Sequence, residues 1–251
     1  MENSGSFVSL ITGAGTGIGQ AVAIKLASSG YSLLICDEHT ELLSETKKQL
    51  ENIQANFSLI SMDLRDKDCI KESFGKAFKK FGKIDHLVNN AGRPLVKAAN
   101  EVAWEEWDEV MDVNLKGPYF LSTLFAREAI RTKKPAAIVN IASTHGITGL
   151  SGRSVYGISK GGLIQMTRML AIEWAEFEIR VNAIAPTTVL TPSRETSLPP
   201  GKKRELAKSR IPLKRFPEAE EIAAGVDYLL SPNAKSITGH TLSIDGGLLS
   251  A

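Results

Sequence analysis

The sequence predicts an α/β fold, with a mostly parallel, doubly wound sheet and helices on both of its faces. Short apolar runs of strand length alternate with longer segments of helical spacing along the whole chain. The first apolar run leads directly into a glycine-rich turn and then into a helix. Polar residues come directly after several of the later apolar segments. These positions are the strand ends at which open parallel sheets bind their ligands.

Length and composition support one large domain. The chain has 251 residues, of which 43% are hydrophobic and 23% charged, as in globular proteins and unlike disordered or fibrous ones. It is long enough to bury a sizeable core. No linker, repeat or low-complexity stretch interrupts the alternation, so we expect a single domain over residues 1–251.

Charge and hydropathy exclude several classes of partner. A net charge of +2 is too small to suggest a nucleic-acid partner. No apolar run approaches the ~20 residues of a membrane span. The N-terminal residues lack the basic start and apolar stretch of a secretory signal. Cys36 and Cys69 lack metal-binding or redox spacing, so we expect reduced thiols, no metal site and a cytoplasmic protein.

The first predicted unit joins two strands through a glycine-rich turn. An apolar strand over 7–12 runs into the sequence TGAGTGIG at 12–19, and helical spacing follows over 20–28. A second strand over 32–36 stops at Asp37. This order of strand, turn, helix, strand and acid is typical of a dinucleotide-binding unit.

The glycines in the turn have physical uses. Gly13 permits the tight exit from the strand, and Gly17 and Gly19 let backbone amides and the helix start approach a pyrophosphate closely. Their spacing is Gly-x-x-x-Gly-x-Gly rather than the commoner Gly-x-Gly-x-x-Gly. The surrounding elements make phosphate binding the preferred interpretation over a purely structural turn.

Asp37 predicts the choice of cofactor. It stands eighteen residues after Gly19, close to the ~20-residue offset at which an acid meets the adenosine ribose. Its carboxylate would accept hydrogen bonds from the ribose hydroxyls of NAD and repel the 2′-phosphate of NADP. At about 5 Å and a dielectric near 20, each such pair of charges costs roughly 3 kcal/mol. The alternative is that Asp37 only caps the next helix.

The same alternation continues to the C-terminus. A helix is expected over 40–53, a strand over 57–62 that ends at Asp63, and a helix over 67–81. The remaining predicted elements are strands over 84–88, 136–141, 180–184 and 241–244, and helices over 104–113, 119–131 and 218–230.

The chemistry is expected around residues 136–168. Ser143 follows a strand, and Tyr156 and Lys160 stand four apart in a predicted helix, one turn from each other. A free tyrosine has a pKa of about 10, and a nearby ammonium would lower it enough for acid–base work near neutrality. The serine could hold a substrate oxygen. The alternative is that a Tyr-x-x-x-Lys pattern occurs here by chance.

A segment over 187–216 follows a strand that ends beside these residues. It is irregular and rich in proline, arginine and lysine. Such a long loop is a candidate substrate lid, although a solvated basic helix over 194–210 is also compatible with the pattern.

Together these motifs resemble the short-chain dehydrogenase/reductase family, in its common form of about 250 residues. The resemblance covers nearly the whole chain. It depends on the glycine-rich turn at 12–19, Asp63, NNAG at 89–92, Asn114, Ser143, Tyr156 with Lys160, Pro186, Thr191 and Asp245-Gly246-Gly247. It implies a Rossmann-like, seven-stranded sheet, and hydride transfer between a nicotinamide cofactor and a secondary alcohol or ketone. It also implies a homotetramer.

The resemblance also implies a role for each matching residue. Tyr156 would exchange the proton, Ser143 would orient the substrate oxygen, and Lys160 would hold the nicotinamide ribose and lower the tyrosine pKa. Asn114 would support a water that relays protons from Lys160; a structural amide is the alternative for it and for Asn90. The residues expected to bind the cofactor are Gly13, Thr16, Gly17, Ile18, Gly19, Asp37, Asp63, Leu64, Asn90, Ala91, Gly92, Tyr156, Lys160, Pro186, Val189 and Thr191.

The sequence shows no cation beside Asp37 that could pair with the 2′-phosphate of NADP. Position 16 is threonine, where phosphate-using relatives often carry arginine or lysine, and Cys36 and Glu38 flank the acid. The sequence therefore favours NAD over NADP.

The substrate is less well determined than the reaction. Thr187, Arg93 and His145 depart from the usual family pattern beside the pocket. The residues expected on the substrate side are Thr144, His145, Leu150, Thr187 and Thr188. A sugar or polyol, a 3-oxoacyl thioester of a carrier protein and a hydrophobic ketone all remain open, as does a non-catalytic dinucleotide sensor or scaffold.

Overall fold

A single parallel sheet organises the computed structural model, which describes residues 6–251 apart from the side chain of Ser193. The strand order is β3-β2-β1-β4-β5-β6-β7. All six neighbouring pairs are parallel. The strands are β1 Val8–Thr12, β2 Ser32–Asp37, β3 Phe57–Ser61, β4 His86–Asn89, β5 Ala136–Ile141, β6 Ile179–Pro186 and β7 Thr241–Ile244. The predicted doubly wound fold is confirmed.

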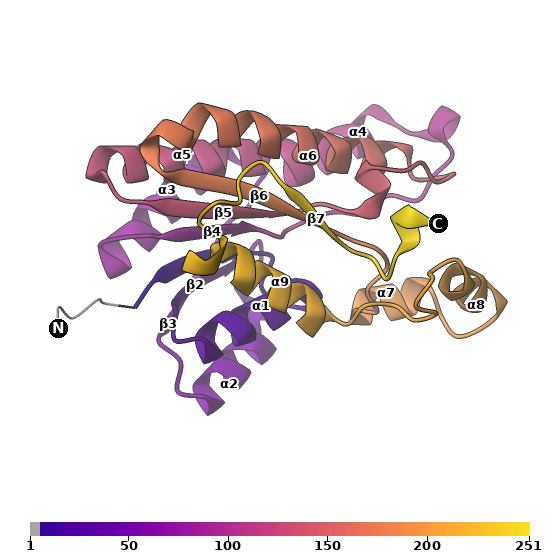
Figure 1. Cartoon of the computed structure of the whole chain (residues 1–251), viewed down its shortest axis with the longest axis horizontal. Coiled ribbons are helices and arrows are strands. Elements are labelled where there is room, and N and C mark those ends of the chain that lie inside the picture. The colour runs from indigo at the N-terminus through magenta and orange to yellow at the C-terminus, as the bar shows by residue number, and fades with distance from the viewer. Residues whose placement is uncertain (1–5) are drawn as a thin grey trace.

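Helices cover both faces of the sheet (Figure 1). The helices α1, α2 and α9 lie on one side, and α3, α4, α5 and α6 on the other. Their bounds are α1 Gly17–Ser28, α2 Ser44–Asn52, α3 Lys67–Phe81, α4 Trp104–Met111, α5 Gly117–Thr132, α6 Ser154–Trp174, α7 Pro192–Ser197, α8 Lys202–Ser209 and α9 Ala219–Leu230. Within the described residues, no helix combines the length and apolar character needed to cross a membrane.

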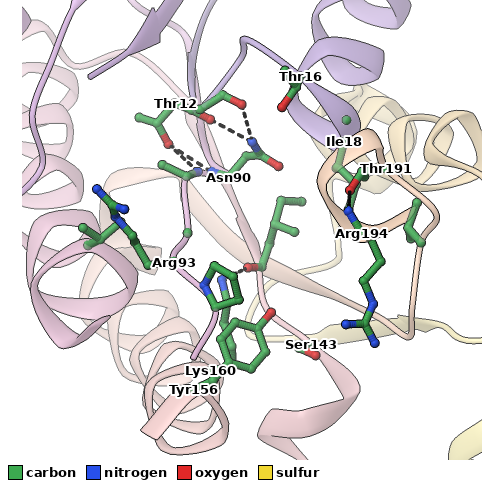
Figure 2. Close-up of a pocket in the computed structure, with 18 of the residues that line it drawn as sticks. Thr12, Thr16, Ile18, Asn90, Arg93, Ser143, Tyr156, Lys160, Thr191 and Arg194 are labelled. Atoms are coloured by element: carbon green, nitrogen blue, oxygen red, sulfur yellow. Dashed lines mark hydrogen bonds between the residues drawn. The ribbon is translucent and has the colours of Figure 1, made fainter. Parts of the chain in front are cut away.

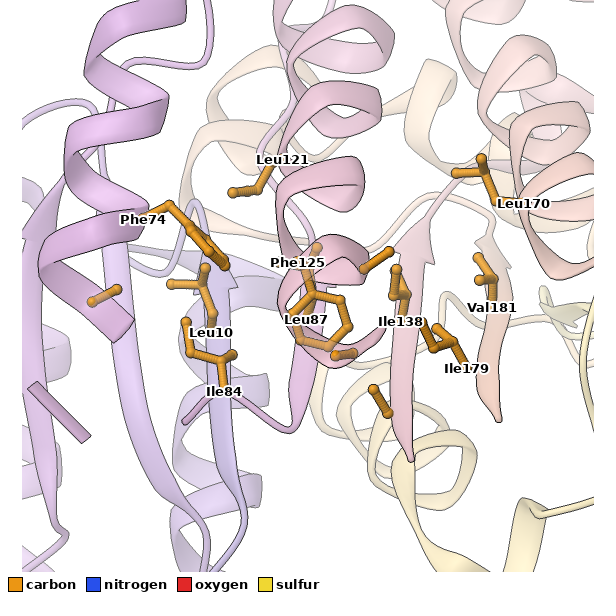
Figure 3. Packing of buried hydrophobic residues seen from close by; sticks show 14 of the residues in the cluster. Leu10, Phe74, Ile84, Leu87, Leu121, Phe125, Ile138, Leu170, Ile179 and Val181 are labelled. Atoms are coloured by element: carbon orange, nitrogen blue, oxygen red, sulfur yellow. The ribbon is translucent and has the colours of Figure 1, made fainter. Parts of the chain in front are cut away.

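Each face of the sheet has its own hydrophobic core. Side chains alternate along a strand, so Leu10 packs into one core and Ile11 into the other. Figure 3 shows the first core, where Phe74 of α3 and Phe125 of α5 pack against strand residues such as Leu87. These two cores hold the strands in register and so fix the positions of the loops at their carboxyl ends.

Some predicted elements differ from the structure. The helix expected over 40–53 is a 3₁₀ turn, Thr40–Leu43, followed by α2. The helix expected over 104–113 ends as α4 at Met111, and the chain continues through a π-helical turn, Asp112–Lys116, into α5. The expected lid segment contains the short helices α7 and α8. The π-helical turn contains Asn114, which affects the site described next.

Candidate active site

A cavity of about 740 Å³ opens at the carboxyl ends of the central strands. Loops after all six strands from β1 to β6 contribute to its walls. Figure 2 shows the glycine-turn residues Thr12, Thr16 and Ile18 at one end and Ser143 and Tyr156 at the other. This volume lies in the range of small-molecule and cofactor pockets.

The turn between β1 and α1 requires its glycines. Gly13 and Gly17 have φ of +63° and +57°, a left-handed conformation that side chains rarely adopt. A Cβ on Gly13 would lie 2.8 Å from the Cα of Ala91, and one on Gly17 would lie 2.6 Å from Cγ2 of Thr191. A Cβ on Gly19 would collide with the carbonyl oxygen of Gly13. Glycine is therefore needed for this turn to pack against its neighbours, and Gly13 and Gly17 also line the cavity, where their backbone could approach a pyrophosphate closely.

Asn90 braces this turn from the neighbouring strand end. Its side-chain amide donates to the carbonyl oxygens of Thr12, at 3.0 Å, and Gly13, at 2.8 Å. The backbone N–H groups of Asn90 and Ala91 both donate to Thr12 Oγ1, at 3.0 and 3.1 Å. The structural alternative for Asn90 and its place in the cavity wall are thus compatible.

Asp37 stands at the end of β2, beside the glycine turn. Its carboxylate accepts backbone N–H groups from Gly15, at 3.2 Å, and Glu38, at 2.9 Å. Burial raises its pKa, and the two backbone hydrogen bonds act against that rise. The half-exposed carboxylate lines the cavity where the adenosine of a dinucleotide would lie.

Two arginines that the sequence did not indicate lie beside Glu38, the residue after Asp37. Glu38 pairs with Arg65 and with Arg93, at 3.3 Å each. Arg65 also pairs with Asp63 at 2.8 Å, and Arg93 pairs with Glu109 at 3.3 Å. These arginines are distant in sequence from Asp37, and only the folded chain brings them near it. Both are engaged by carboxylates.

Lys160 reaches the cavity from α6 with a buried ammonium. Its side chain donates to the carbonyl oxygen of Ile141 at 2.7 Å, and Lys160 is only 4% exposed. Burial lowers the pKa of Lys160 to about 8. The ammonium lies 5.9 Å from the centre of the Tyr156 ring, on the same side of the helix.

Tyr156 differs from the sequence expectation in its electrostatics. Burial raises its pKa, while a hydrogen bond with Ser143 and the charges of Arg153 and Arg194 act in the opposite direction. Lys160, which was expected to lower the pKa, is not among the groups that dominate it here. The phenol therefore holds its proton near neutrality, as a proton donor to a ketone must.

His145 sits next to the serine. Ser143 Oγ accepts the backbone N–H of His145 at 3.1 Å, and the His145 ring packs edge-on to Tyr156 with centroids 6.1 Å apart. Burial first, then Arg153 and Arg194, lowers the pKa of His145. A neutral imidazole thus faces the space beside the phenol.

Asn114 is fully buried and does not line the cavity. Its side-chain oxygen accepts the Arg93 N–H at 2.7 Å, and its amide donates to the Arg93 carbonyl at 3.0 Å and to Ser159 Oγ at 2.9 Å. A Cβ on Gly92 would lie 3.4 Å from both this oxygen and Lys160 Nζ. Asn114 therefore fixes the loop after β4 directly beside the lysine.

Most predicted site residues meet in this one cavity, and four do not. Those that line it are Gly13, Thr16, Gly17, Ile18, Asp37, Asp63, Leu64, Asn90, Ala91, Gly92, Ser143, His145, Tyr156, Lys160, Pro186, Thr187, Thr188, Val189 and Thr191. Gly19 and Asn114 are buried behind the wall. Two substrate-side expectations are corrected: Thr144 is fully buried in the 3₁₀ turn after Ser143, and Leu150 lies exposed outside the cavity.

Sequence reasoning missed two arginines in the cavity wall, Arg153 and Arg194. Each stands three residues from a recognised position, before Tyr156 and after Thr191 respectively. That spacing was the available signal, because it brings each arginine about one helical turn from a site residue.

The residues present fit a nicotinamide dinucleotide. Gly13, Thr16 and Gly17 line the cavity where α1 begins, and a helix N-terminus can hold a pyrophosphate. Asp37 and Lys160 line the same cavity and could each accept or donate hydrogen bonds to a ribose. Among residues 6–251, no group of histidine, cysteine or acidic side chains could hold a metal ion.

Comparisons with known proteins agree with this chemistry. A family model described as enoyl-(acyl carrier protein) reductase matches residues 13–249. A 3-oxoacyl-[acyl-carrier-protein] reductase of Thermotoga maritima is 39% identical over 242 residues, covering 96% of this chain and 97% of the relative. An NAD-dependent glycerol dehydrogenase of Listeria innocua is 36% identical over 241 residues, covering 96% and 92%.

Solved structures are similar over the whole chain. A short-chain type dehydrogenase/reductase from Mycobacterium marinum superposes with a TM-score of 0.92 at 28% identity, covering 98% of this chain and 96% of that one. An actinorhodin polyketide ketoreductase with NADPH has a TM-score of 0.90 at 31% identity, covering 97% of both chains.

Proposed function

The chain belongs to the short-chain dehydrogenase/reductase family and is an oxidoreductase, and from that premise we propose that it interconverts a secondary alcohol and a ketone with NAD(H). The main observation behind this proposal is that Ser143, Tyr156 and Lys160 line the same cavity as the glycine-rich turn after β1. A bound nicotinamide supplies or accepts the hydride.

The residues of the chain perform the remaining chemistry. Ser143 Oγ holds the substrate oxygen, and Tyr156 exchanges the proton with it. Lys160 binds the ribose and holds a positive charge near the phenol when the cofactor is in place. Because Ser143, Tyr156, Lys160 and Asn114 are all present, a silent sensor or scaffold is the weaker alternative.

NAD(H) is proposed rather than NADP(H) on account of Asp37. Its carboxylate faces the adenosine end, and the nearby Arg65 and Arg93 are already paired with Glu38, Asp63 and Glu109. Among the relatives, the actinorhodin ketoreductase structure carries NADPH and the Listeria glycerol dehydrogenase is NAD-dependent, so relatives differ in cofactor. The NAD-dependent glycerol dehydrogenase supports the choice made here.

For the substrate, we propose a sugar, a polyol or another small hydroxy compound, in line with the glycerol dehydrogenase relative. The alternative, reduction of a 3-oxoacyl thioester, is supported by the Thermotoga relative. We propose further that residues 187–216 act as a substrate lid and that the enzyme is cytoplasmic, in keeping with the free thiols of Cys36 and Cys69.

Removing the hydroxyl group of Tyr156 tests its role as the proton carrier of the reaction. Tyr156→Phe keeps the ring and should lower kcat by about a hundredfold or more, the usual range for losing a general acid or base. NADH should still bind, as measured by its fluorescence. Turnover is followed by the absorbance of the reduced nicotinamide over a substrate panel. Retention of a tenth of wild-type activity would show that Tyr156 is not the proton carrier.

A further inference from the structure

The substrate end of the cavity is positively charged. Arg153 precedes Tyr156 by three residues at the start of α6, and Arg194 lies in α7 of the segment that follows β6. Both line the cavity together with Ser143, His145 and Tyr156. Figure 2 shows the Arg194 side chain running away from Thr16 and Ile18 and toward Ser143.

Neither guanidinium is neutralised within the described chain. Among residues 6–251, no carboxylate forms an ion pair with Arg153 or Arg194. Arg194 donates one long hydrogen bond, 3.4 Å, to Ser197 Oγ. The acidic residues that line the cavity, Asp37, Glu38 and Asp63, lie at the adenosine end. The cavity therefore has its carboxylates, two of them paired with arginines, at the adenosine end, and two arginines without a paired carboxylate at the substrate end.

The two arginines are also partly removed from water. Burial lowers the pKa of each, and the pKa of Arg153 is lowered further by the charge of Arg194. Both charges also act on His145 and Tyr156, which places them close to the reacting centre. Two partly desolvated like charges without a counter-ion are costly, and an anion bound between them would offset that cost.

We infer that Arg153 and Arg194 bind a carboxylate of the substrate, so that the enzyme oxidises a small hydroxy acid or reduces the matching keto acid. This inference rests on the proposed function, since the hydroxyl must lie at Tyr156 while the carboxylate lies at the arginines. The carboxylate takes no part in the redox step. A thioester on a long carrier arm would hold its phosphate far from the reacting carbon and outside this cluster.

The position of Arg194 also links binding to the proposed lid. Arg194 is carried by α7, which begins after Thr191 and belongs to the segment 187–216. Arg153 is the N-cap residue of α6, and that helix packs into the core. A carboxylate shared by both guanidinium groups would hold α7 against the fixed wall of the cavity.

Paired substrates of equal skeleton and different charge test this. We would compare D-gluconate with D-glucitol, glycerate with glycerol, and 3-hydroxybutyrate with 3-hydroxybutyramide. The variants are Arg153→Gln, Arg194→Gln and both arginine-to-lysine changes. Arg168→Gln is the matched control, because Arg168 is an exposed arginine on the same helix as Arg153.

The wild type should favour the acid of a pair at least tenfold in kcat/KM. Each glutamine variant should lower kcat/KM for the acid on the order of ten- to a hundredfold, chiefly through KM, as expected for a lost hydrogen bond to a charged group. The kcat/KM for the neutral partner should fall less than that for the acid, because the neutral compound loses only the effect of the arginine charges on Tyr156 and His145. The lysine variants should be intermediate, because they keep the charge and lose the planar fork. Arg168→Gln should match the wild type.

A binding measurement separates this inference from the proposed function. Calorimetric titration of the same acids into the enzyme–NADH complex reports anion binding without turnover and with the pyrophosphate position already filled. Acid binding that needs both arginines, without turnover of any compound, would contradict the proposed reaction alone. Preference for the neutral partners, or acid binding and kcat/KM unchanged in both glutamine variants, would overturn the carboxylate site.

Discussion

Asp37 combines two roles in one carboxylate. It accepts two backbone N–H groups at the glycine turn and still faces the cavity. The first role is structural and the second is selective, because a 2′-phosphate would meet a like charge there. At about 5 Å and a dielectric near 20 the repulsion is roughly 3 kcal/mol per pair of charges, and screening by salt still leaves at least tenfold discrimination.

The Asp37→Ala variant should have a smaller ratio of kcat/KM with NAD(H) to kcat/KM with NADP(H) than the wild type. We expect KM for NADP(H) to fall, while KM for NAD(H) rises because the ribose hydrogen bonds are lost. The measurement is kcat/KM with each cofactor in both proteins. Glu41→Ala, a change in an exposed acid nearby, is the control. Equal efficiency of the wild-type enzyme with NAD(H) and NADP(H) would refute the assignment.

Residues in short local patterns were predictable from sequence. The four-residue spacing of Tyr156 and Lys160 predicts that they share one face of a helix, and the position of Ser143 at a strand end predicts that it lies at the same edge of the sheet. The spacing of Arg153 from Tyr156 and of Arg194 from Thr191 indicated that each is near a site residue, but it did not predict that the two line one cavity, because that depends on how the segment after β6 folds. For the same reason, no local pattern near Asp37 indicated Arg65 or Arg93.

At the level of elements, periodicity predicted the strands better than the ends of helices. The strands β1, β2 and β5 are short, mostly apolar runs buried on both faces of the sheet, and such runs are visible in the sequence. The π-helical turn Asp112–Lys116 was not predicted, because a wider turn leaves no composition signal. The structure shows what the turn achieves, since it directs Asn114 onto the backbone of Arg93.

The first residue of β4 makes the stability of the sheet depend on pH. His86 is 4% exposed, and Ser9 Oγ lies 3.2 Å from its Nδ1. Burial lowers the pKa of His86 to about 4, and Asp85 opposes that shift. The unfolded chain, with an ordinary pKa of about 6.5, then binds the proton more tightly than the native protein does.

Stability from His86 is therefore fully present above pH ~6.5 and is lost as the pH falls toward ~4, by roughly 3 kcal/mol at most. Urea unfolding at several pH values measures this loss. The double variant His86→Phe/Ser9→Ala removes the titrating group without leaving a buried hydroxyl unpaired. In this variant the free energy of unfolding should depend less on pH between about 4 and 6.5. His39→Gln, a change in an exposed histidine, should not alter this dependence. Identical slopes in the wild type and the double variant would contradict this prediction.

At the scale of the whole molecule, large apolar side chains remain exposed on one side. Trp104 of α4 is 83% exposed, Ile172 of α6 77% and Phe120 of α5 53%. The three helices lie on the same side of the sheet (Figure 1). Other large apolar side chains, such as Leu42 and Ile53, are exposed elsewhere, but Trp104 and Ile172 are the two most exposed of these. Large exposed apolar side chains are typical of surfaces that contact another protein. We propose that this side joins subunits in a homotetramer.

Light scattering after size exclusion should give a mass near four times that of the chain. Phe120→Asp and Ile172→Asp should each lower that mass, because a charge at an apolar contact is left without a partner. Leu206→Asp is the control, because it places the same charge on an exposed apolar residue of α8, away from this side of the sheet. It should leave the mass of the assembly unaltered. A monomeric wild type would exclude the proposal.

The bracing of the glycine turn by Asn90 has a consequence for the order of folding. That hydrogen bond joins residues 77 apart, so it closes a long loop and forms only after β1 and β4 have paired. Tyr156 and Lys160 follow later still in the chain. During synthesis, a chain that ends before α6 has the glycine turn but half a binding site. A dinucleotide therefore binds the complete folded chain better than any partly folded one. It stabilises the native state at equilibrium and does not speed the early steps of folding.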